Sequence, residues 1–440
     1  MRSAFLAIVL AYVLYIGISY PFVAMLAYVW IDIVKPQSLA YSLINTLPLS
    51  LIAAGLTLVS FVLKGEKRKV PDGTIVFLLM FFALWITFTT FVADPGIQPW
   101  TKWDWAFKVV VFSTFIPFVI RTRVHIEAFL LAMVFAVATI TFSAGIKSAL
   151  GGGGYGVLAV MGTSNSGLAE GSTLAAVCLM QLPIMHYLYK HSVIFAGVRA
   201  FKLLIAGTAL INIFAVVGSG ARTGLVAGGV LIALYGVRSR HKFAFAAGLV
   251  VALAIVSQLD LSKTAWGERM SSINTYQQDS SALGRVAVWK WTVDFALKNP
   301  LGGGFDAFRL NHIALVTEEG IQYYDSRQYM GKAFHNIFFE VMGEQGLFGL
   351  AIYLFIIGRT FVKLAQMRKR SRGDPQYEWL SDLSLKISDA LILLLVGGMF
   401  VGIAYQGYIF YLIALTVSLG GLAVTTKRGE RLLKTYAEQH

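Results

Sequence analysis

The sequence predicts an all-α polytopic membrane protein with about twelve transmembrane helices and one long loop on its outer face. Of its 440 residues, 57% are hydrophobic and only 14% are charged. Apolar runs of about 17 to 25 residues recur along the chain, and a helix of that length crosses a hydrocarbon layer about 30 Å thick. Because these runs are continuously apolar and do not alternate, they exclude a transmembrane β-barrel.

The predicted spans follow one another at short intervals, apart from one long gap. They are residues 4–34, 40–63, 74–93, 106–121, 125–148, 169–190, 200–217, 221–237, 242–258, 335–365, 385–404 and 408–425. The first run is too long for one straight span and contains Pro21, which predicts a kink or a broken pair of half-helices. A full hairpin at Pro21 would add one span and move the N-terminus to the outer face, whereas Arg2 favours a single crossing.

The distribution of lysine and arginine predicts the orientation. If every run crosses once, 24 of the 37 basic residues lie on one side, and five lie in short connections on the other side. Eight more lie in the long loop. By the positive-inside rule, both termini and the basic connections are cytoplasmic. The formal net charge of +14 therefore reflects membrane orientation, and we expect membrane lipids, not nucleic acid, as the partner of these charges.

Cofactor chemistry has little support in the sequence. Cys178 is the only cysteine and lies in an apolar run, which excludes disulfides and cysteine-ligated metals. The outer connections contain no Asp-x-Asp motif and no His and carboxylate cluster with metal-ligand spacing. We therefore expect neither a metal ion nor another cofactor.

The long loop, residues 259–334, divides the chain into an N-terminal transmembrane bundle, 1–258, and C-terminal helices with a cytoplasmic tail, 335–440. It holds eight basic and eight acidic residues, so its charge does not indicate a polyanion-binding surface. A helix is predicted at about 281–298, where serines begin it and Asn299, Pro300 and three glycines end it. Arg285 and Trp289, four residues apart, share one face of this helix.

Three candidate residues fall on the outer face: Arg222, Arg285 and His335. Each also has an ordinary explanation. Arg222 can be an interfacial arginine, Arg285 a solvated or ion-paired loop residue, and His335 a hydrogen-bonding residue at a helix N-terminus. The turn "GSGAR" is more specific, because small residues before a helix N-terminus leave backbone N–H groups able to face an anion.

In combination these segments resemble a known family. "GSGARTG", "GRVAVWKWTVDFALKNPLGGGFDAF" and "FHNIFFEVMGEQGLFGL", within residues 160–420, are similar to the O-antigen ligase and O-antigen polymerase superfamily, membrane glycosyltransferases of the GT-C type. The N-terminal part, with "YVWIDIVKPQSLAYS" and "GGGGYG", resembles the O-glycosylation ligases associated with exosortase systems.

The resemblance implies transfer of a glycan from a polyprenyl (undecaprenyl) diphosphate donor to an acceptor hydroxyl on the periplasmic face of the bacterial inner membrane. It assigns donor diphosphate binding to Arg222 and Arg285, and activation of the acceptor to His335. Lipid A core oligosaccharide is the expected acceptor. Guanidinium groups fit phosphate oxygens in bidentate geometry and can replace a divalent cation, so the expected reaction is metal-independent. A base assists the sugar hydroxyl, and attack from the face opposite the diphosphate makes the expected reaction inverting.

Other polar residues receive supporting or open assignments. Asn336, Trp289 and Glu170 are possible supporting residues of the site. Glu340 and Glu344 fall within a predicted span, where a carboxylate is either functional or satisfies neighbouring backbone in the bundle interior.

Alternative functions stay open at this point. An O-antigen or exopolysaccharide polymerase, or a protein O-glycosylation ligase, would use the same donor. A polytopic transporter is the alternative from a different class. It would be expected to show two related halves, and the sequence contains no internal repeat.

Overall fold

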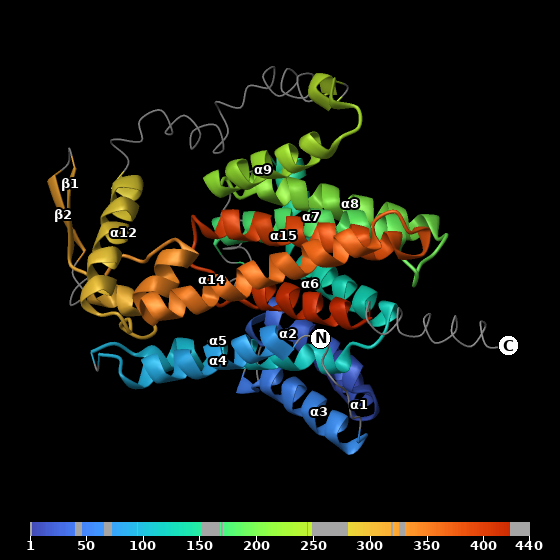
Figure 1. Ribbon diagram of the computed structural model, residues 1–440, viewed down its shortest axis with the longest axis horizontal. Helices are drawn as coiled ribbons and strands as arrows, with labels where there is room; N and C mark the ends of the chain where they lie inside the picture. The colour runs from blue at the N-terminus through green and yellow to red at the C-terminus, as the bar shows by residue number, and fades with distance from the viewer. Residues whose placement is uncertain are drawn as a thin grey trace.

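The computed structural model describes residues 2–39, 46–65, 73–94, 96–151, 168, 170–243, 245–248, 280–317, 320–324 and 331–422. This part of the chain is almost entirely helical (Figure 1). Its main α-helices are α1 (Arg2–Ser19), α2 (Pro21–Val34), α3 (Leu49–Leu63), α4 (Gly73–Phe91), α5 (Pro99–Val119), α6 (Arg123–Gly151), α7 (Gly171–His191), α8 (Arg199–Gly218), α9 (Arg222–Arg238), α12 (Ser280–Lys298), α14 (Ile337–Ser371) and α15 (Glu378–Gly398). A further apolar helix spans Gly407–Leu422.

The predicted all-α membrane fold is confirmed. Among the described residues, five helices are long and apolar enough to cross a membrane, namely α4, α6, α7, α8 and α14. Four further apolar helices of the described chain are shorter. The total of about twelve spans stays a prediction, since the run 242–258 extends beyond the described residues.

The first apolar run is broken, as Pro21 predicts. Tyr20 has an extended backbone, with φ −129° and ψ 94°, between α1 and α2. Pro21 is the first residue of α2, where its missing N–H costs no intrahelical hydrogen bond. The run 4–34 is therefore two helices and not one long kinked helix.

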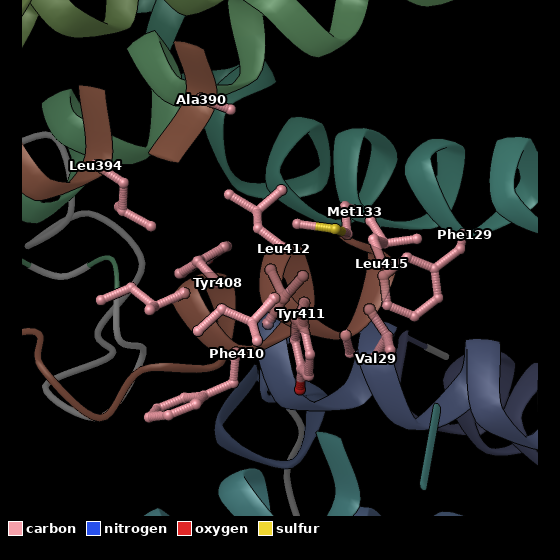
Figure 2. Close-up of a cluster of buried hydrophobic side chains, with 14 of the residues drawn as sticks. Val29, Phe129, Met133, Ala390, Leu394, Tyr408, Phe410, Tyr411, Leu412 and Leu415 are labelled. Atoms are coloured by element: carbon pink, nitrogen blue, oxygen red, sulfur yellow. The ribbon is translucent and has the colours of Figure 1, made fainter. Parts of the chain in front are cut away.

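The helix Gly407–Leu422 lies at the centre of the apolar core. Figure 2 shows Tyr408, Tyr411 and Leu415 of this helix among side chains from α2, α6 and α15. Leu412, Ala414 and Leu415 are fully buried. An apolar helix buried on all sides contacts protein instead of lipid, so this helix organises the bundle around itself.

The long helix α14 is interrupted at Gly346. This residue has φ 71° and ψ −175°, a conformation open almost only to glycine. The interruption frees backbone groups that a continuous helix would pair. Inside a membrane protein such groups must find partners, because unpaired polar backbone is costly in an apolar medium.

The glycine-rich loop after α12 fills this break. The amides of Gly303 and Gly304 donate to the carbonyls of Gly343 and Glu344, both at 2.9 Å. In return, the amide of Leu347 donates to the Pro300 carbonyl at 3.1 Å. The "PLGGG" and "GEQG" segments are thus two halves of one backbone lock.

The structure describes residues 280–317, 320–324 and 331–334 of the long loop. Its predicted helix at 281–298 is confirmed as α12, which runs across the ends of the bundle helices instead of along them (Figure 1). Two strands, β1 (Ile313–Thr317) and β2 (Gly320–Tyr324), form an antiparallel hairpin that the sequence did not indicate. The 3₁₀ turn η5 (Ala307–Leu310) connects the glycine loop to β1. The division at 259–334 stays a prediction, although α12 packs directly on α14.

Replacing Gly346 by alanine tests the lock. A Cβ at this position would overlap the Pro300 carbonyl oxygen, and the backbone conformation is unfavourable for alanine. We expect Gly346→Ala to lose about 2 kcal/mol or more of unfolding free energy and to lower the midpoint of thermal unfolding in detergent. Gly358→Ala in the same helix is the matched control, because a Cβ there meets open space. Equal midpoints of thermal unfolding for the two variants would show that the backbone lock at Gly346 does not stabilise the fold.

Candidate active site

The tight turn between α8 and α9 carries Arg222. Helix α8 ends at Gly218, and Arg222 is the first residue of α9. Gly220 turns the chain with φ 58°, and the amide of Ala221 donates to the Ser219 hydroxyl at 3.2 Å. The positive end of the α9 dipole and the Arg222 side chain therefore occupy the same short segment, as the sequence predicts.

Glu170 lies beside this turn. It is the N-cap residue of α7, and the next residue, Gly171, is so close to the turn that an added Cβ would be 3.1 Å from the Ser219 carbonyl oxygen. Partial burial raises the pKa of Glu170, although its side chain keeps contact with solvent. The Thr173 hydroxyl and the positive charge of Arg285 oppose this rise of the pKa. Glu170 thus interacts electrostatically with Arg285 of α12.

The C-terminal end of α15 packs against the first residues of both α9 and α14. A Cβ at Gly397 would overlap Ala176 of α7 and would be 3.7 Å from the Thr223 side chain. A Cβ at the neighbouring Gly398 would be 2.8 Å from Ile337. Since Thr223 follows Arg222 and Ile337 follows Asn336, the two predicted site segments reach the same end of the bundle on either side of α15.

His335 has an unusual backbone. Its φ is 49°, in the left-handed region that non-glycine residues seldom adopt. The indole Nε1–H of Trp289 donates to the Phe334 carbonyl at 2.9 Å, and the Trp289 ring stacks on Phe339 with centroids 5.1 Å apart. Trp289 therefore holds the backbone immediately before His335 against α12, and strained backbone of this kind is concentrated at functional sites.

The environment of His335 favours the neutral imidazole. Its pKa is lowered from 6.5 to about 4, mainly by burial and further by the positive charges of Arg285 and Lys332. Burial is the larger cause, and Arg285 and Lys332 supply the two positive charges.

Asn336 fixes the segment from the other side. Its side-chain oxygen accepts hydrogen bonds from the amides of Phe338 at 2.8 Å and Phe339 at 3.4 Å, which caps α14. Its side-chain NH₂ donates to the Met399 carbonyl at 3.1 Å, at the end of α15. Asn336 is 3% exposed, so its observed contacts position the backbone next to His335.

The structure thus brings together most of the residues that the sequence singled out. Arg285, His335 and Glu170 interact electrostatically, with Trp289 and Asn336 holding the histidine segment. Arg222 reaches the same end of the bundle through the turn beside Glu170. Their roles in chemistry stay predictions. Among the described residues, no group of three or more His, Cys, Asp or Glu is placed to hold a metal ion.

A buried ionic cluster beneath this end was only half anticipated. The Lys102 ammonium lies 2.6 Å from Glu340 Oε1 and 2.7 Å from Glu344 Oε1, and the two glutamate side chains are 5% and 0% exposed. Backbone amides of Asp306 and Ala404 also donate to these carboxylates, each at 3.0 Å. The two glutamates therefore pair with a lysine and accept hydrogen bonds from backbone amides in the bundle interior, which fits one of the two interpretations left open by the sequence.

Lys102 itself was missed as their partner. In the sequence it is one of a few outer basic residues, 238 positions before Glu340. The available signal was indirect. Two glutamates four residues apart in an apolar run lie on one helix face and require a cation.

These features define a multi-pass membrane protein with a cationic, partly buried polar site at one end of its helical bundle. Residues 207–354, which include Arg222, Arg285 and His335, match the family described as O-Antigen ligase. This match confirms the resemblance of the motifs to the O-antigen ligase superfamily over these residues. The match supports a membrane glycosyltransferase of the O-antigen ligase or polymerase type.

The N-terminal half has a separate match. Residues 1–193 match a family of unknown function, DUF5935. No curated protein shows a significant match to the chain. The similarity to exosortase-associated ligases stays a prediction.

Removing the Lys102 ammonium tests the ionic cluster. We expect Lys102→Met to lose about 3–5 kcal/mol of unfolding free energy, because two buried carboxylates would remain without their cation. Lys108→Met is the matched control in the same helix, since its ion pair with Asp104 has side chains 38% and 56% exposed. The control should lose about 1 kcal/mol or less. Similar losses of unfolding free energy for both variants, measured by chemical unfolding, would show that the buried cluster stabilises the fold no more than an exposed ion pair does.

Proposed function

We propose that this protein transfers a glycan from a polyprenyl diphosphate donor to an acceptor hydroxyl on the periplasmic face of the bacterial inner membrane. The observation that carries the proposal is the placement of His335, held neutral in a left-handed conformation beside Arg285, inside the region that matches the O-antigen ligase family. The positive-inside distribution of Lys and Arg supports a periplasmic orientation for this end of the bundle.

The donor diphosphate is assigned to Arg222 and Arg285. Arg222 begins α9, where free backbone N–H groups and the helix dipole favour an anion. Arg285 lies on α12, which crosses the ends of the bundle helices (Figure 1). A lipid-linked diphosphate at the membrane surface would meet both guanidinium groups, whose planar donors fit phosphate oxygens.

The reaction breaks the bond between the anomeric carbon and the diphosphate oxygen and forms a bond from that carbon to the acceptor oxygen. The acceptor proton passes to the neutral ring of His335, and the departing polyprenyl diphosphate keeps the bonding electron pair. The two arginines stabilise the charge that develops on the leaving group. Attack from the face opposite the diphosphate gives inversion at the anomeric carbon.

Lipid A core oligosaccharide is the acceptor that we propose, with a protein or a growing glycan as the alternatives. Extracts of a deletion strain separate these cases. Loss of a ligase leaves unattached polyprenyl-linked polymer, loss of a polymerase leaves single repeat units on the lipid, and loss of a transporter leaves the donor trapped inside the cell.

Replacing His335 tests the assignment of the base. With purified protein, lipid-linked donor and acceptor, His335→Ala should lower the transfer rate by about 10²-fold or more, because general-base assistance is typically worth at least that factor. Donor binding and the unfolding midpoint should remain. The control is His241→Ala, an exposed histidine just after α9. Transfer by His335→Ala near the parent rate would assign this histidine to packing alone.

The low pKa of His335 predicts the pH dependence of transfer. The base must be neutral, and with a pKa of about 4 the imidazole is neutral throughout pH 5 to 8. As pH falls through about 4, the imidazolium forms and transfer is lost. We therefore expect kcat/KM to stay level down to about pH 5 and to fall only below it. An acidic limb centred near the ordinary histidine value of about 6.5 would contradict the burial of this side chain.

A further inference from the structure

A second cleft lies far along the same helices from the candidate active site. It is formed by the C-terminal halves of α7 and α9 and the N-terminal half of α8, and its volume is about 420 Å³. Its apolar wall includes Leu182, Met185, Ile205, Ala206, Ala209 and Leu231. The candidate site is at the opposite ends of these helices, where Glu170 and Arg222 lie.

Small side chains on α8 leave this space open. Ala206 and Ala209 face the cleft where larger residues would fill it. At one side, Phe245 lines the cleft and packs against Gly236, where an added Cβ would be 2.7 Å from its ring. The result is a cleft whose apolar lining suits a hydrocarbon chain.

Two polar residues of the cleft wall contact each other. His186 Nδ1 and the Tyr235 hydroxyl are 3.0 Å apart, and the Lys386 ammonium donates to the same hydroxyl at 3.2 Å. His186 and Tyr235 both line the cleft. Lys386 is 6% exposed and lies 4.5 Å from the centre of the Tyr235 ring, so a buried cation stands behind the cleft wall.

Positive charge dominates the rim. The Lys202 ammonium lies over the ring of Tyr189, which lines the cleft, at 5.5 Å from the ring centroid. Residues 186–242 contain no Asp or Glu, and six of their seven Lys and Arg lie at this end of the helices. In the part of the chain that the structure describes, α15 supplies acidic partners to this rim: Glu378 pairs with Lys190 at 3.0 Å, and Asp389 pairs with Arg238 at 2.6 Å.

We propose that this cleft binds an anionic glycerophospholipid of the cytoplasmic leaflet. One acyl chain lies along the apolar wall formed by Leu182, Ile205 and Leu231, and the phosphate lies at Lys202. The positive-inside rule assigns this end of the bundle to the cytoplasmic surface, where acidic lipids meet basic residues. The proposal concerns a structural lipid and is independent of the proposed glycan transfer.

Lipid binding to the purified full-length protein tests the proposal. The protein in a neutral detergent is titrated with dioleoylphosphatidylglycerol or dioleoylphosphatidylcholine, and binding is followed by native mass spectrometry and by the midpoint of thermal unfolding. We expect the anionic lipid to bind about fivefold more tightly, because a nearby basic residue contributes about 1 kcal/mol, a factor of about five, and Lys202 lies at the rim of the cleft.

Two variants and two matched controls locate the site. Ala206→Phe fills the cleft and should abolish the preferred binding, whereas Ala233→Phe, at an exposed position of α9 outside the cleft, should not. Lys202→Gln should weaken binding of the anionic lipid about fivefold, whereas Lys298→Gln, at the end of α12, should not.

A photoreactive phosphatidylglycerol keeps the test decisive if a variant fails to fold. In the parent protein its acyl chain should cross-link to residues 182–189 and 205–209. Equal affinity for the two lipids, unchanged binding to folded Ala206→Phe, or the absence of cross-links to these residues would overturn the proposal. The last result would mean that the protein's own chain occupies the cleft.

Discussion

The backbone lock between the glycine-rich loop after α12 and the interrupted helix α14 determines the geometry of the end of the bundle that carries the candidate site. A break in a membrane-spanning helix exposes N–H and C=O groups that no water molecule of the hydrocarbon layer can satisfy. Gly303, Gly304 and Pro300 supply the missing partners. Because this loop directly follows α12, the lock fixes the helix that carries Arg285 against the helix that begins just after His335. The two residues are thereby held close enough to interact electrostatically.

The same region separates two kinds of buried charge. Lys102 lies between Glu340 and Glu344, and backbone amides of Asp306 and Ala404 donate to the two carboxylates, so the ammonium is paired inside the bundle. Around His335 the balance is different. Burial lowers its pKa, and the positive charges of Arg285 and Lys332 lower it further, so the histidine stays uncharged beside cationic neighbours. An anion entering this neighbourhood would be attracted by charges that the histidine does not neutralise, which is the electrostatic basis of the proposed donor site.

Much of this arrangement could be predicted from local sequence signals. The apolar runs predict the helices because each run is long, continuous and bounded by charged residues, and the loop helix at 281–298 is recovered as α12 because serine begins it and proline with glycines ends it. The contacts that position the site are different in kind. Lys102 and Glu340 are 238 residues apart, and the donor to the Phe334 carbonyl is Trp289, 45 residues earlier. Contacts between residues so far apart in the chain leave no repeating pattern in the sequence. For this reason neither the ion pairs of Lys102 nor the break of α14 at Gly346 could be predicted from the sequence alone. The short hairpin β1–β2 was missed because five-residue strands in a polar loop have weak patterns.

The central claim is that Arg222, Arg285 and His335 form one site for a lipid-linked diphosphate. The most direct measurement is a cryo-electron microscopy structure of the full-length protein in nanodiscs with bound polyprenyl diphosphate. We expect phosphate oxygens within hydrogen-bonding distance, about 3 Å, of the guanidinium groups of Arg222 and Arg285. The His335 ring should face the bond that would be broken in a glycosylated donor. A diphosphate bound elsewhere on the protein, or held by only one of the two arginines with His335 turned away, would contradict this claim.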